Sequence, residues 1–421
     1  MGNAPKVAIL YHFFYPDDVV SARHFSDLAE GLAAAGWEVE VLPSNRGCRN
    51  PAQIYPLRER WRGVVISRIW RPRFAQSSSL GRILNAAWMI AAWSRIALRG
   101  KADCPDFVLV GTDPILSVLV ALPLKWLRPE IKVAHWAFDL YPEAAIADGM
   151  LSPSGKVARL LNSVLRRAYA QCDLVVDLGI CMKRRLVAYG GGAAHCTIVP
   201  WALAEEKAPI PPEPELRLRL FGNAKLAILY SGNFGRAHAY SDFLALARSM
   251  RSSGVEFRWS VRGNAVEQLH SEIRSSDVNI GLVGFVPESE LARHLAAADI
   301  HMVSLKPEWS GVVVPSKFFG SLAAARPVLF AGPEDSSVAH WIREHGVGWV
   351  LNQSSVDELR FRLRYLADHP ERLRELQAHC FSVYQSSFSR DKMIAAWARE
   401  LSELSPRPAP IEGACTGSGN L

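Results

Sequence analysis

Pro315, Ser316 and Lys317 form a junction between a predicted strand and a predicted helix that could hold an anion. Proline suits the first position of a helix, and a serine side chain there can accept a hydrogen bond from an unpaired backbone N–H. The apolar residues that follow are typical of a buried helix, which Pro327 should end before the next strand. A helix that begins here presents free N–H groups, the positive end of its dipole and a lysine. The junction predicts a phosphate site, with an ordinary loop-to-helix turn as the alternative.

A glycine-containing turn earlier in the chain could supply a second phosphate contact. Gly232 and Gly235 flank Asn233 and allow tight turns and a close approach of the backbone to a ligand, and Arg236 adds a guanidinium fork. A plain turn between a strand and a helix explains the two glycines equally well. If both turns face one ligand, Arg236 and Lys317 could neutralise a diphosphate leaving group electrostatically. The sequence contains no His-Glu-x-x-His or Asp-x-Asp pattern that would indicate a metal site.

Two further stretches place polar residues after predicted strands. Asp139 follows an apolar strand and could accept a substrate hydroxyl or its proton, although an Asx turn or a helix N-cap is an equal alternative. The loop from Tyr15 to Arg23 follows the first strand of the chain. Arg23 and His24 begin the next helix and could bind phosphate, and a surface salt bridge would explain them as well.

The elements that must position these residues alternate between strand and helix. An apolar strand at 6–13, a helix at 22–35 closed by Gly36, and a strand at 37–42 indicate a parallel crossover unit. The first turn lacks the Gly-x-Gly-x-x-Gly pattern, which disfavours a nicotinamide or flavin site. The strand-helix pattern restarts near residue 226. Because ligands bind at the C-terminal ends of the strands in such sheets, two facing domains would place all four stretches around one cleft.

The sequence therefore predicts an α/β protein with two Rossmann-like, doubly wound domains. We expect an N-terminal domain at 1–204, a proline-rich linker at 205–214 and a C-terminal domain at 215–388. A last helix at 389–404 is expected to return to the first domain. The tail at 405–421, rich in proline and glycine, has too little apolar content to pack and is expected to be disordered.

Composition narrows the class of protein. The chain has 421 residues, 49% of them hydrophobic, and a formal net charge of +7, which suits an anionic partner. It has no Lys/Arg-rich run of the nucleic-acid type. Its seven cysteines are scattered and odd in number, as expected for free thiols in a reducing cytosol.

The N-terminus leads into a strand rather than a signal peptide, and no apolar run reaches the roughly 18 residues of a membrane span. We expect a soluble or peripheral protein.

The four stretches, in this order, resemble the family-4 retaining glycosyltransferases of the GT-B fold over about residues 6 to 404. The resemblance rests on YHFFYPDD, FDLYPE, YSGNFGRAH, the stretch VGFVPESELARHLAAADIHMVSL and the stretch KPEWSGVVVPSKFFGSLAAARPVL. The Asp-Leu-Tyr-Pro-Glu and Pro-Ser-Lys motifs are similar to those of bacterial enzymes that build O-antigen, capsule or colanic-acid units, including N-acetylfucosamine transferase-like proteins. The resemblance implies a hexosyltransferase that uses a nucleotide sugar, expected to be UDP-linked, without a metal or other cofactor.

The same resemblance implies roles for individual residues. Arg236 and Lys317 would hold the donor diphosphate, and Asp139 would lie near the reacting sugar. Gly232, Asn233, Gly235 and Ser316 would complete the donor site, and the loop that carries Tyr15, Asp17, Arg23 and His24 would face the acceptor.

The chain departs from the family pattern at several places. The family usually has two glutamates where this chain has Val312 and Gly320, so either another acid, such as Glu308, takes their role or the donor is held differently. Arg326 stands where the family generally has glycine. The usual lysine after Arg236 is also missing, and His238 and Ser241 stand there instead. These departures leave two alternatives open: a sugar-nucleotide epimerase of the same architecture, and a non-catalytic subunit that binds a nucleotide sugar.

Enzymes of this kind commonly use a polyprenyl-diphosphate-linked saccharide as acceptor, so the resemblance also implies a surface that faces the cytoplasmic membrane. The helix at 80–99 has no single polar face, because Trp88 and Ile96 lie among the basic residues Arg82, Arg95 and Arg99, and it is the favoured candidate for an interfacial anchor. Burial against a neighbour or in a homodimer is its alternative. The helix at 155–171 separates a basic face from an apolar face, and we favour a helix that covers the sheet with a solvated basic side.

Overall fold

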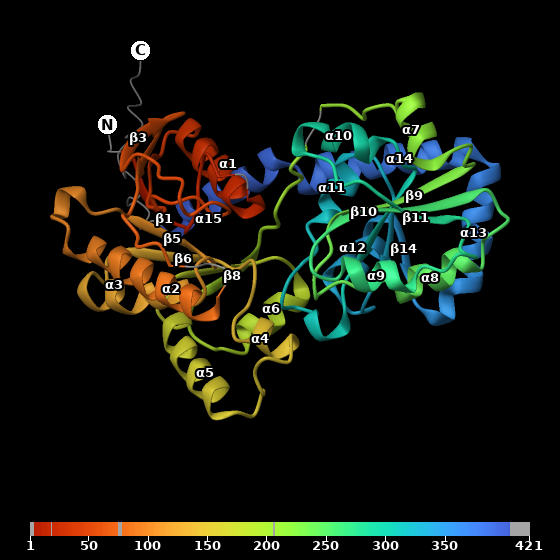
Figure 1. Cartoon of the computed structure of the whole chain (residues 1–421). Coiled ribbons are helices and arrows are strands. Elements are labelled where there is room, and N and C mark those ends of the chain that lie inside the picture. Colours follow the sequence, from red (N-terminus) through yellow and green to blue (C-terminus); the bar gives the residue numbers. More distant parts are fainter. Residues whose placement is uncertain (1–3, 18, 75–77, 205–206, 405–421) are drawn as a thin grey trace, which may run out of the picture.

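The computed structural model describes residues 4–404 except 18, 75–77 and 205–206, and it contains two α/β domains (Figure 1). The first is built on an eight-stranded sheet with the order β3-β4-β2-β1-β5-β6-β7-β8. All neighbouring strands are parallel except β3 and β4. The strands are β1 (Lys6–Leu10), β2 (Glu38–Val41), β3 (Arg58–Trp61), β4 (Val64–Ser67), β5 (Phe107–Gly111), β6 (Lys132–Trp136), β7 (Leu174–Asp177) and β8 (Ala194–Thr197).

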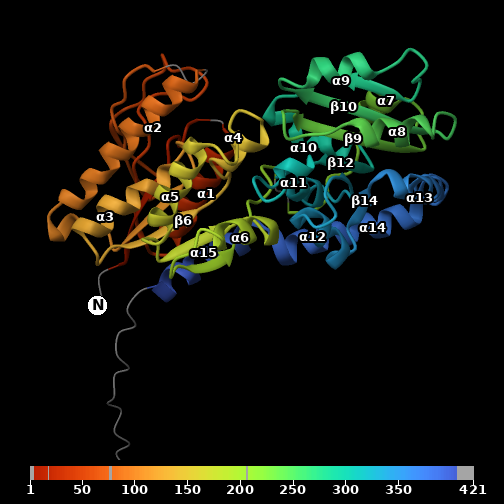
Figure 2. The same ribbon diagram turned by 90° about the horizontal axis from the view of Figure 1, so that it is seen from below.

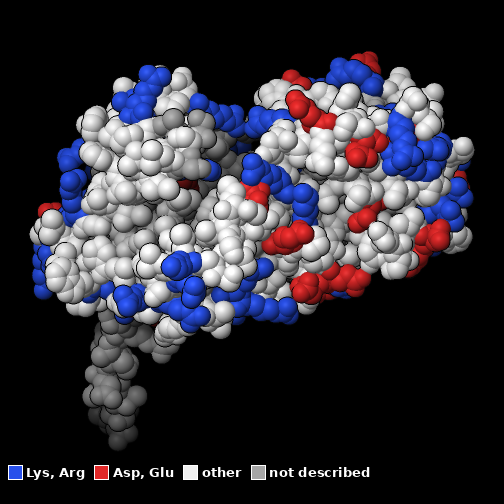
Figure 3. Space-filling model, turned by 60° about the horizontal axis from the view of Figure 1, so that its bottom comes forward, with Lys and Arg blue, Asp and Glu red and all other residues white. Residues whose placement is uncertain are grey.

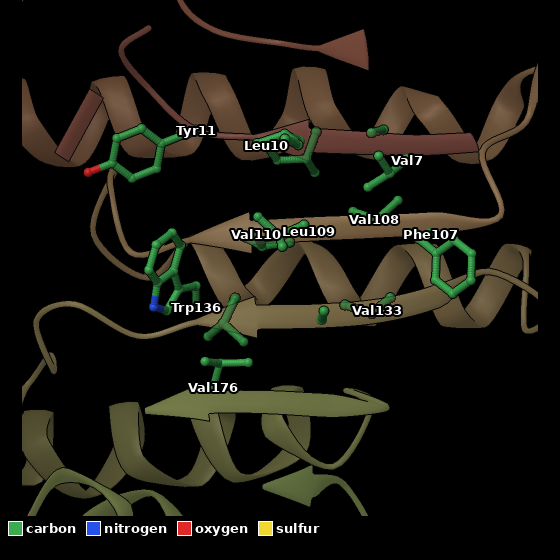
Figure 4. Close-up of a cluster of buried hydrophobic side chains, with 14 of the residues drawn as sticks. Val7, Leu10, Tyr11, Phe107, Val108, Leu109, Val110, Val133, Trp136 and Val176 are labelled. Atoms are coloured by element: carbon green, nitrogen blue, oxygen red, sulfur yellow. The ribbon is translucent and has the colours of Figure 1, made fainter. Parts of the chain in front are cut away.

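Helices cover both faces of this sheet. Figure 1 shows α2, α3 and α5 on one side and α1 with the C-terminal helix α15 on the other. The helices are α1 (Val20–Ala34), α2 (Ser79–Ser94), α3 (Ala121–Leu127), α4 (Glu143–Ala147), α5 (Lys156–Tyr169) and α6 (Ile180–Val187), with 3-10 turns η1 (Arg95–Leu98), η2 (Lys101–Asp103) and η3 (Ser117–Val120). Because both faces are covered, the central strands β1, β5 and β6 are buried on both sides and consist mainly of apolar residues rather than alternating. Figure 4 shows this core, with Val7, Leu10, Phe107–Val110, Val133, Trp136 and Val176.

The second domain has six parallel strands in the doubly wound order β11-β10-β9-β12-β13-β14. Its strands are β9 (Leu226–Asn233), β10 (Val255–Arg262), β11 (Ile280–Val283), β12 (Ile300–Ser304), β13 (Val328–Ala331) and β14 (Gly348–Leu351). Its helices are α7 (Pro214–Phe221), α8 (Ser241–Arg248), α9 (Val266–Glu272), α10 (Glu288–Ala296), α11 (Lys317–Ala323), α12 (Ser337–His345), α13 (Val356–Asp368) and α14 (Pro370–Val383), with turns η4 (Pro307–Trp309) and η5 (Gln353–Ser355).

The chain then crosses back to the first domain. A π-helical turn, η6 (Tyr384–Phe388), leads into α15 (Arg390–Leu404). Trp397 and Leu401 of α15 are buried in the core of the first domain, where the Trp397 ring lies 5.2 Å from that of Trp136. The two connections between the domains also touch, because the Ala202 N–H donates a hydrogen bond of 3.0 Å to the Tyr384 hydroxyl.

Two local features differ from the sequence analysis. The helix after the Pro-Ser-Lys junction starts at Lys317, and Ser316 makes no side-chain cap, because its backbone is already helical. The antiparallel edge strand β3 was missed because its three consecutive charged residues, Arg58, Glu59 and Arg60, resemble an exposed loop.

Parts of two predicted segments lie outside the described residues, namely the tail at 405–421 and residues 205–206 of the linker. Among the helices of the described chain, none is both long and apolar enough to cross a membrane.

Candidate functional site

The loops that follow β6, β9 and β12 meet between the two domains. The Leu140 N–H, after β6, donates a hydrogen bond of 3.1 Å to the carbonyl of Val312, after β12. A cavity of about 590 Å³ lies between the domains. It is lined by Ala147, Asp148 and Gly149 of the first domain and by Arg236, Asn264, Ala265, Gln268, Lys306, Glu308 and Trp309 of the second. Loops that follow strands of both sheets therefore border one cavity, and Arg236 and Glu308 are the predicted site residues that line it.

Lys317 is held against the turn that follows β9. Its Nζ donates a hydrogen bond of 2.8 Å to the Asn233 carbonyl and lies 5.4 Å from the centre of the Tyr230 ring. Gly232 has a φ of +119°, and a Cβ there would lie only 2.9 Å from Cε of Lys317. Glycine is therefore needed both for the backbone conformation and for the space that the lysine occupies. Burial lowers the pKa of Lys317 to about 8.

His238 completes the surroundings of this lysine. Its Nδ1 lies 2.9 Å from the Ser304 carbonyl and its Nε2 lies 3.5 Å from Lys317 Nζ. Burial, together with the neighbouring Lys317 charge, lowers the pKa of His238 to about 3, so the ring is neutral near pH 7. With the proton on Nδ1, Nε2 points an acceptor lone pair at the ammonium group. His238 thus supports Lys317 without adding a second positive charge.

Arg236 stands at the opposite side of the same turn and forms an ion pair with Asp148, at the end of α4. The pair connects the two domains across the cavity, and Glu308 of η4 lines the same cavity. The structure thus brings Gly232, Asn233 and Lys317 into contact and places Arg236 and Glu308 at the cavity wall. Gly235 adjoins Asn233, with 3.5 Å between the position of an added Cβ and Asn233 Nδ2. Ser316 immediately precedes Lys317 and has no side-chain cap bond.

The structure shows what surrounds three residues at which this chain departs from the family pattern. Val312 is buried and its carbonyl joins the domains, as described above. An added Cβ at Gly320 would meet nothing within 4 Å, so no neighbour in the protein requires a glycine there. Arg326 is buried and donates hydrogen bonds to the carbonyls of Ala296 and Ala324, which makes it part of the scaffold.

Asp139 lies on the first-domain side, in the loop after β6. The protein around it and the nearby carboxylate of Asp113 raise its pKa to about 6. Asp113 follows β5, the strand beside β6, and its Oδ1 lies 3.3 Å from Nδ1 of the buried His12, which follows β1. Sequence reasoning missed His12, Asp113 and Asp148. The first two could have been found, since both follow apolar strands of the same sheet.

The four candidates of the first loop separate into two pairs. Tyr15 is exposed and stacks on Trp61 at 4.6 Å, and Asp17 accepts a hydrogen bond of 3.1 Å from the Cys48 N–H. Arg23 instead donates to the Leu203 carbonyl at 3.2 Å, and buried His24 contacts the Trp201 carbonyl at 2.9 Å. Arg23 and His24 therefore hold the connection between the domains.

The described residues contain no group of three or more His, Cys, Asp or Glu side chains arranged to hold a metal ion. The charged residues that line the cavity are Arg236, Lys306 and Glu308 on the second domain and Asp148 on the first.

Two facing Rossmann-like domains with a polar cleft between them define the GT-B class, and solved structures agree. The chain is similar to sucrose-phosphate synthase from Thermosynechococcus elongatus, with a TM-score of 0.69, 14% identity, and 95% and 99% of the two chains covered. It is also similar to HepE from Anabaena in complex with UDP, with a TM-score of 0.65, 14% identity and 95% and 100% covered. For WaaG, a glycosyltransferase involved in lipopolysaccharide biosynthesis, the TM-score is 0.62 at 15% identity, with 94% and 99% covered.

Sequence comparisons agree with this class. Residues 21–202 match the glycosyl transferase 4-like domain. "Probable glycosyltransferase WbjE" of Pseudomonas aeruginosa is 26% identical over 282 residues, 66% of this chain and 70% of the relative. "Amylovoran biosynthesis glycosyltransferase AmsK" of Erwinia amylovora is 23% identical over 199 residues, 46% of this chain and 47% of the relative. The protein is therefore a glycosyltransferase of the GT-B fold, as the sequence predicts, and its first domain is similar to the glycosyl transferase 4-like domain.

Proposed function

We propose that the protein transfers a sugar from a UDP-linked donor to a polyprenyl-diphosphate-linked saccharide, with retention of the anomeric configuration. The reaction would serve the synthesis of a surface polysaccharide such as O-antigen, capsule or exopolysaccharide, at the inner face of the cytoplasmic membrane. The observation that carries the donor assignment is the contact of Lys317 with Gly232 and Asn233, in the turn that leads to Arg236 at the cavity wall. The names of the WbjE and AmsK relatives and the UDP-bound HepE structure support the pathway and the nucleotide.

On the donor side, Lys317 and Arg236 would bind the two phosphates of the nucleotide sugar. The diphosphate would replace Asp148 as the partner of Arg236 and would keep Lys317 protonated, because an anion beside a buried ammonium favours its charged form. As the bond between the anomeric carbon and the diphosphate oxygen breaks, both cations would stabilise the charge that develops on the leaving group. No general acid is needed for that step, and no metal or other cofactor is expected.

On the acceptor side, the attacking hydroxyl would approach from the face that the diphosphate leaves, which retains the anomeric configuration. Its oxygen bonds to the anomeric carbon while its proton passes to the departing diphosphate. Asp139 would orient this hydroxyl by accepting a hydrogen bond, and Asp113, fixed by His12, would stand beside it. Tyr15 and Asp17 would line the approach of the acceptor.

A donor screen followed by transfer tests this proposal. We expect one or a few UDP-sugars to raise the melting temperature, and the stabilised protein to move the labelled sugar onto a lipid extract from bacterial membranes. EDTA should leave the rate unchanged. Failure of every UDP-sugar to bind would contradict the donor assignment. Conversion of the donor without any acceptor would identify an epimerase, and binding without product across a panel of lipid acceptors would identify a non-catalytic subunit.

A further inference from the structure

We propose that the side of the first domain covered by α2 and α5 binds the surface of an anionic lipid bilayer. We call it the α2–α5 face and define it by its apolar residues Trp70, Leu80, Ile83, Leu84, Trp88, Val157 and Leu160 and its basic residues Lys156, Arg159 and Arg167. The inference rests on the proposed function, because a lipid-linked acceptor lies in a membrane, and it adds which surface meets that membrane and which lipids it selects.

Helix α2 leaves an apolar stripe in solvent. Leu80 and Ile83 are 67% and 55% exposed, and Leu84 and Trp88 continue the stripe at helical spacing. The opposite side of α2, with Met89 and Trp93, is fully buried against the sheet. A surface helix of a globular domain normally turns polar residues outward. Because α2 already has one buried apolar side, its second apolar side needs another partner.

Two tryptophans stand at one end of this stripe. Trp70 follows β4 and is 55% exposed. The centres of the Trp70 and Trp88 rings are 5.6 Å apart. The Trp88 indole N–H donates a hydrogen bond of 2.8 Å to the Trp70 carbonyl, so the two rings are fixed relative to each other. Indole rings of this kind favour the boundary between water and hydrocarbon, where an apolar body and a polar edge are both accommodated.

Helix α5 extends the face and differs from the sheet-covering helix favoured by the sequence. Ala158, Leu165 and Ala168 are buried, whereas Val157 and Leu160 are 58% and 66% exposed among Lys156 and Arg159. The first half of α5 therefore presents apolar and basic side chains to solvent together, as interfacial helices do. Helices α2, α3 and α5 share this side of the domain, as the view from below shows (Figure 2).

The positive charge of the α2–α5 face favours an anionic partner. Neither α2 nor α5 contains an acidic residue, and within the described chain Lys156, Arg159 and Arg167 form no ion pair. Figure 3 shows a broad white area on this domain with blue at its margins and little red. A second copy of the chain on this face would bring like charges together in a self-complementary contact. A bilayer with anionic headgroups accepts the apolar residues and neutralises the basic ones.

Vesicle sedimentation tests the inference on the full chain. We expect the wild type to bind phosphatidylglycerol-containing vesicles and to bind pure phosphatidylcholine vesicles far more weakly. The triple variant Leu80→Ser, Ile83→Ser, Leu84→Ser should lose at least about tenfold in affinity, since it removes exposed apolar area. The variant Lys156→Gln, Arg159→Gln, Arg167→Gln should lose about 100-fold at low salt and less at high salt.

Matched variants on the second domain serve as controls. Val278→Ser with Phe361→Ser removes exposed apolar residues, and Arg364→Gln with Arg374→Gln removes exposed cations, and both should bind vesicles as the wild type does. Binding of UDP, measured by calorimetry without vesicles, should be the same in all variants. Vesicle binding by the α2 variant equal to that of the wild type would overturn the inference, as would conversion of a wild-type dimer to a monomer by that variant. Loss of UDP binding in the wild type would instead contradict the proposed function and leave the vesicle result standing.

Discussion

The two sides of the cleft are built by different means. On the second domain, Arg236 stands in the turn after β9, and Lys317 of α11 packs against that turn, whose glycine makes room for the lysine. On the first domain, the carboxylates Asp139 and Asp113 follow neighbouring strands and are brought together only by the sheet. The donor side therefore depends on the conformation of a short segment, and the acceptor side depends on the packing of a whole domain. Substitutions should affect the two sides differently.

The largest effect is expected for Lys317→Ala. Loss of a buried cation aimed at the leaving group should lower kcat/KM by about 10²- to 10³-fold, as loss of one preorganised donor does in other enzymes. Steady-state transfer of the labelled sugar measures it. Lys225→Ala, which removes an exposed ion pair with Asp368 on the same domain, should leave the rate nearly unchanged. A Lys317→Ala enzyme with wild-type activity would remove the basis of the donor assignment.

Gly232→Ala should come next. The new Cβ would stand 2.9 Å from Cε of Lys317 in a backbone of φ +119°, so both the fold and the lysine must shift. We expect a stability loss of about 1–3 kcal/mol together with a fall in transfer of about tenfold or more. Gly222→Ala is the matched control, because Gly222 has a φ of +58° and nothing within 4 Å. The control should lose stability and keep its kcat, and equal kinetic losses in the two variants would argue against a special role of Gly232.

On the acceptor side, Asp139 should appear in the dependence of the rate on pH. Because its pKa is raised to about 6, the carboxylate that accepts the hydroxyl hydrogen bond is lost as the pH falls through that value. The wild-type kcat/KM should decline about tenfold per pH unit below pH 6. Asp139→Asn should be slower at pH 8 and should lack this decline. If the decline of kcat/KM below pH 6 were unchanged in the Asp139→Asn enzyme, the ionisation would belong to another group.

The smallest effect is expected for Asp148→Asn. The carboxylate of Asp148 pairs with the exposed Arg236 and must leave it when the donor diphosphate binds. Exposed ion pairs contribute about 0.2–1 kcal/mol, so the variant should bind UDP roughly 1.5- to 5-fold more tightly in calorimetry. Weaker binding of UDP would show that Asp148 positions Arg236 for the donor rather than competing with it.

The sequence predicted most of the fold because the buried parallel strands are short apolar runs bounded by turn residues, as at Phe107–Gly111 and Ile300–Ser304. It predicted Lys317 and Arg236 because phosphate sites use local motifs. It did not predict the neighbourhood of Asp113 and His12, which depends on three strands far apart in the chain. For α5 the helical pattern separated basic from apolar residues but could not show that the sheet covers only part of the apolar side.

The return of α15 has a consequence for how the protein is made. Trp397 and Leu401 fill the core of the first domain, and Ile394 lies so close to α1 that Gly31 has no room for a Cβ. The ribosome therefore completes the second domain before it delivers the last piece of the first. Until then the core of the nascent first domain lacks Trp397 beside Trp136 and the contact of α15 with α1, so apolar surface stays exposed and favours aggregation until α15 is made.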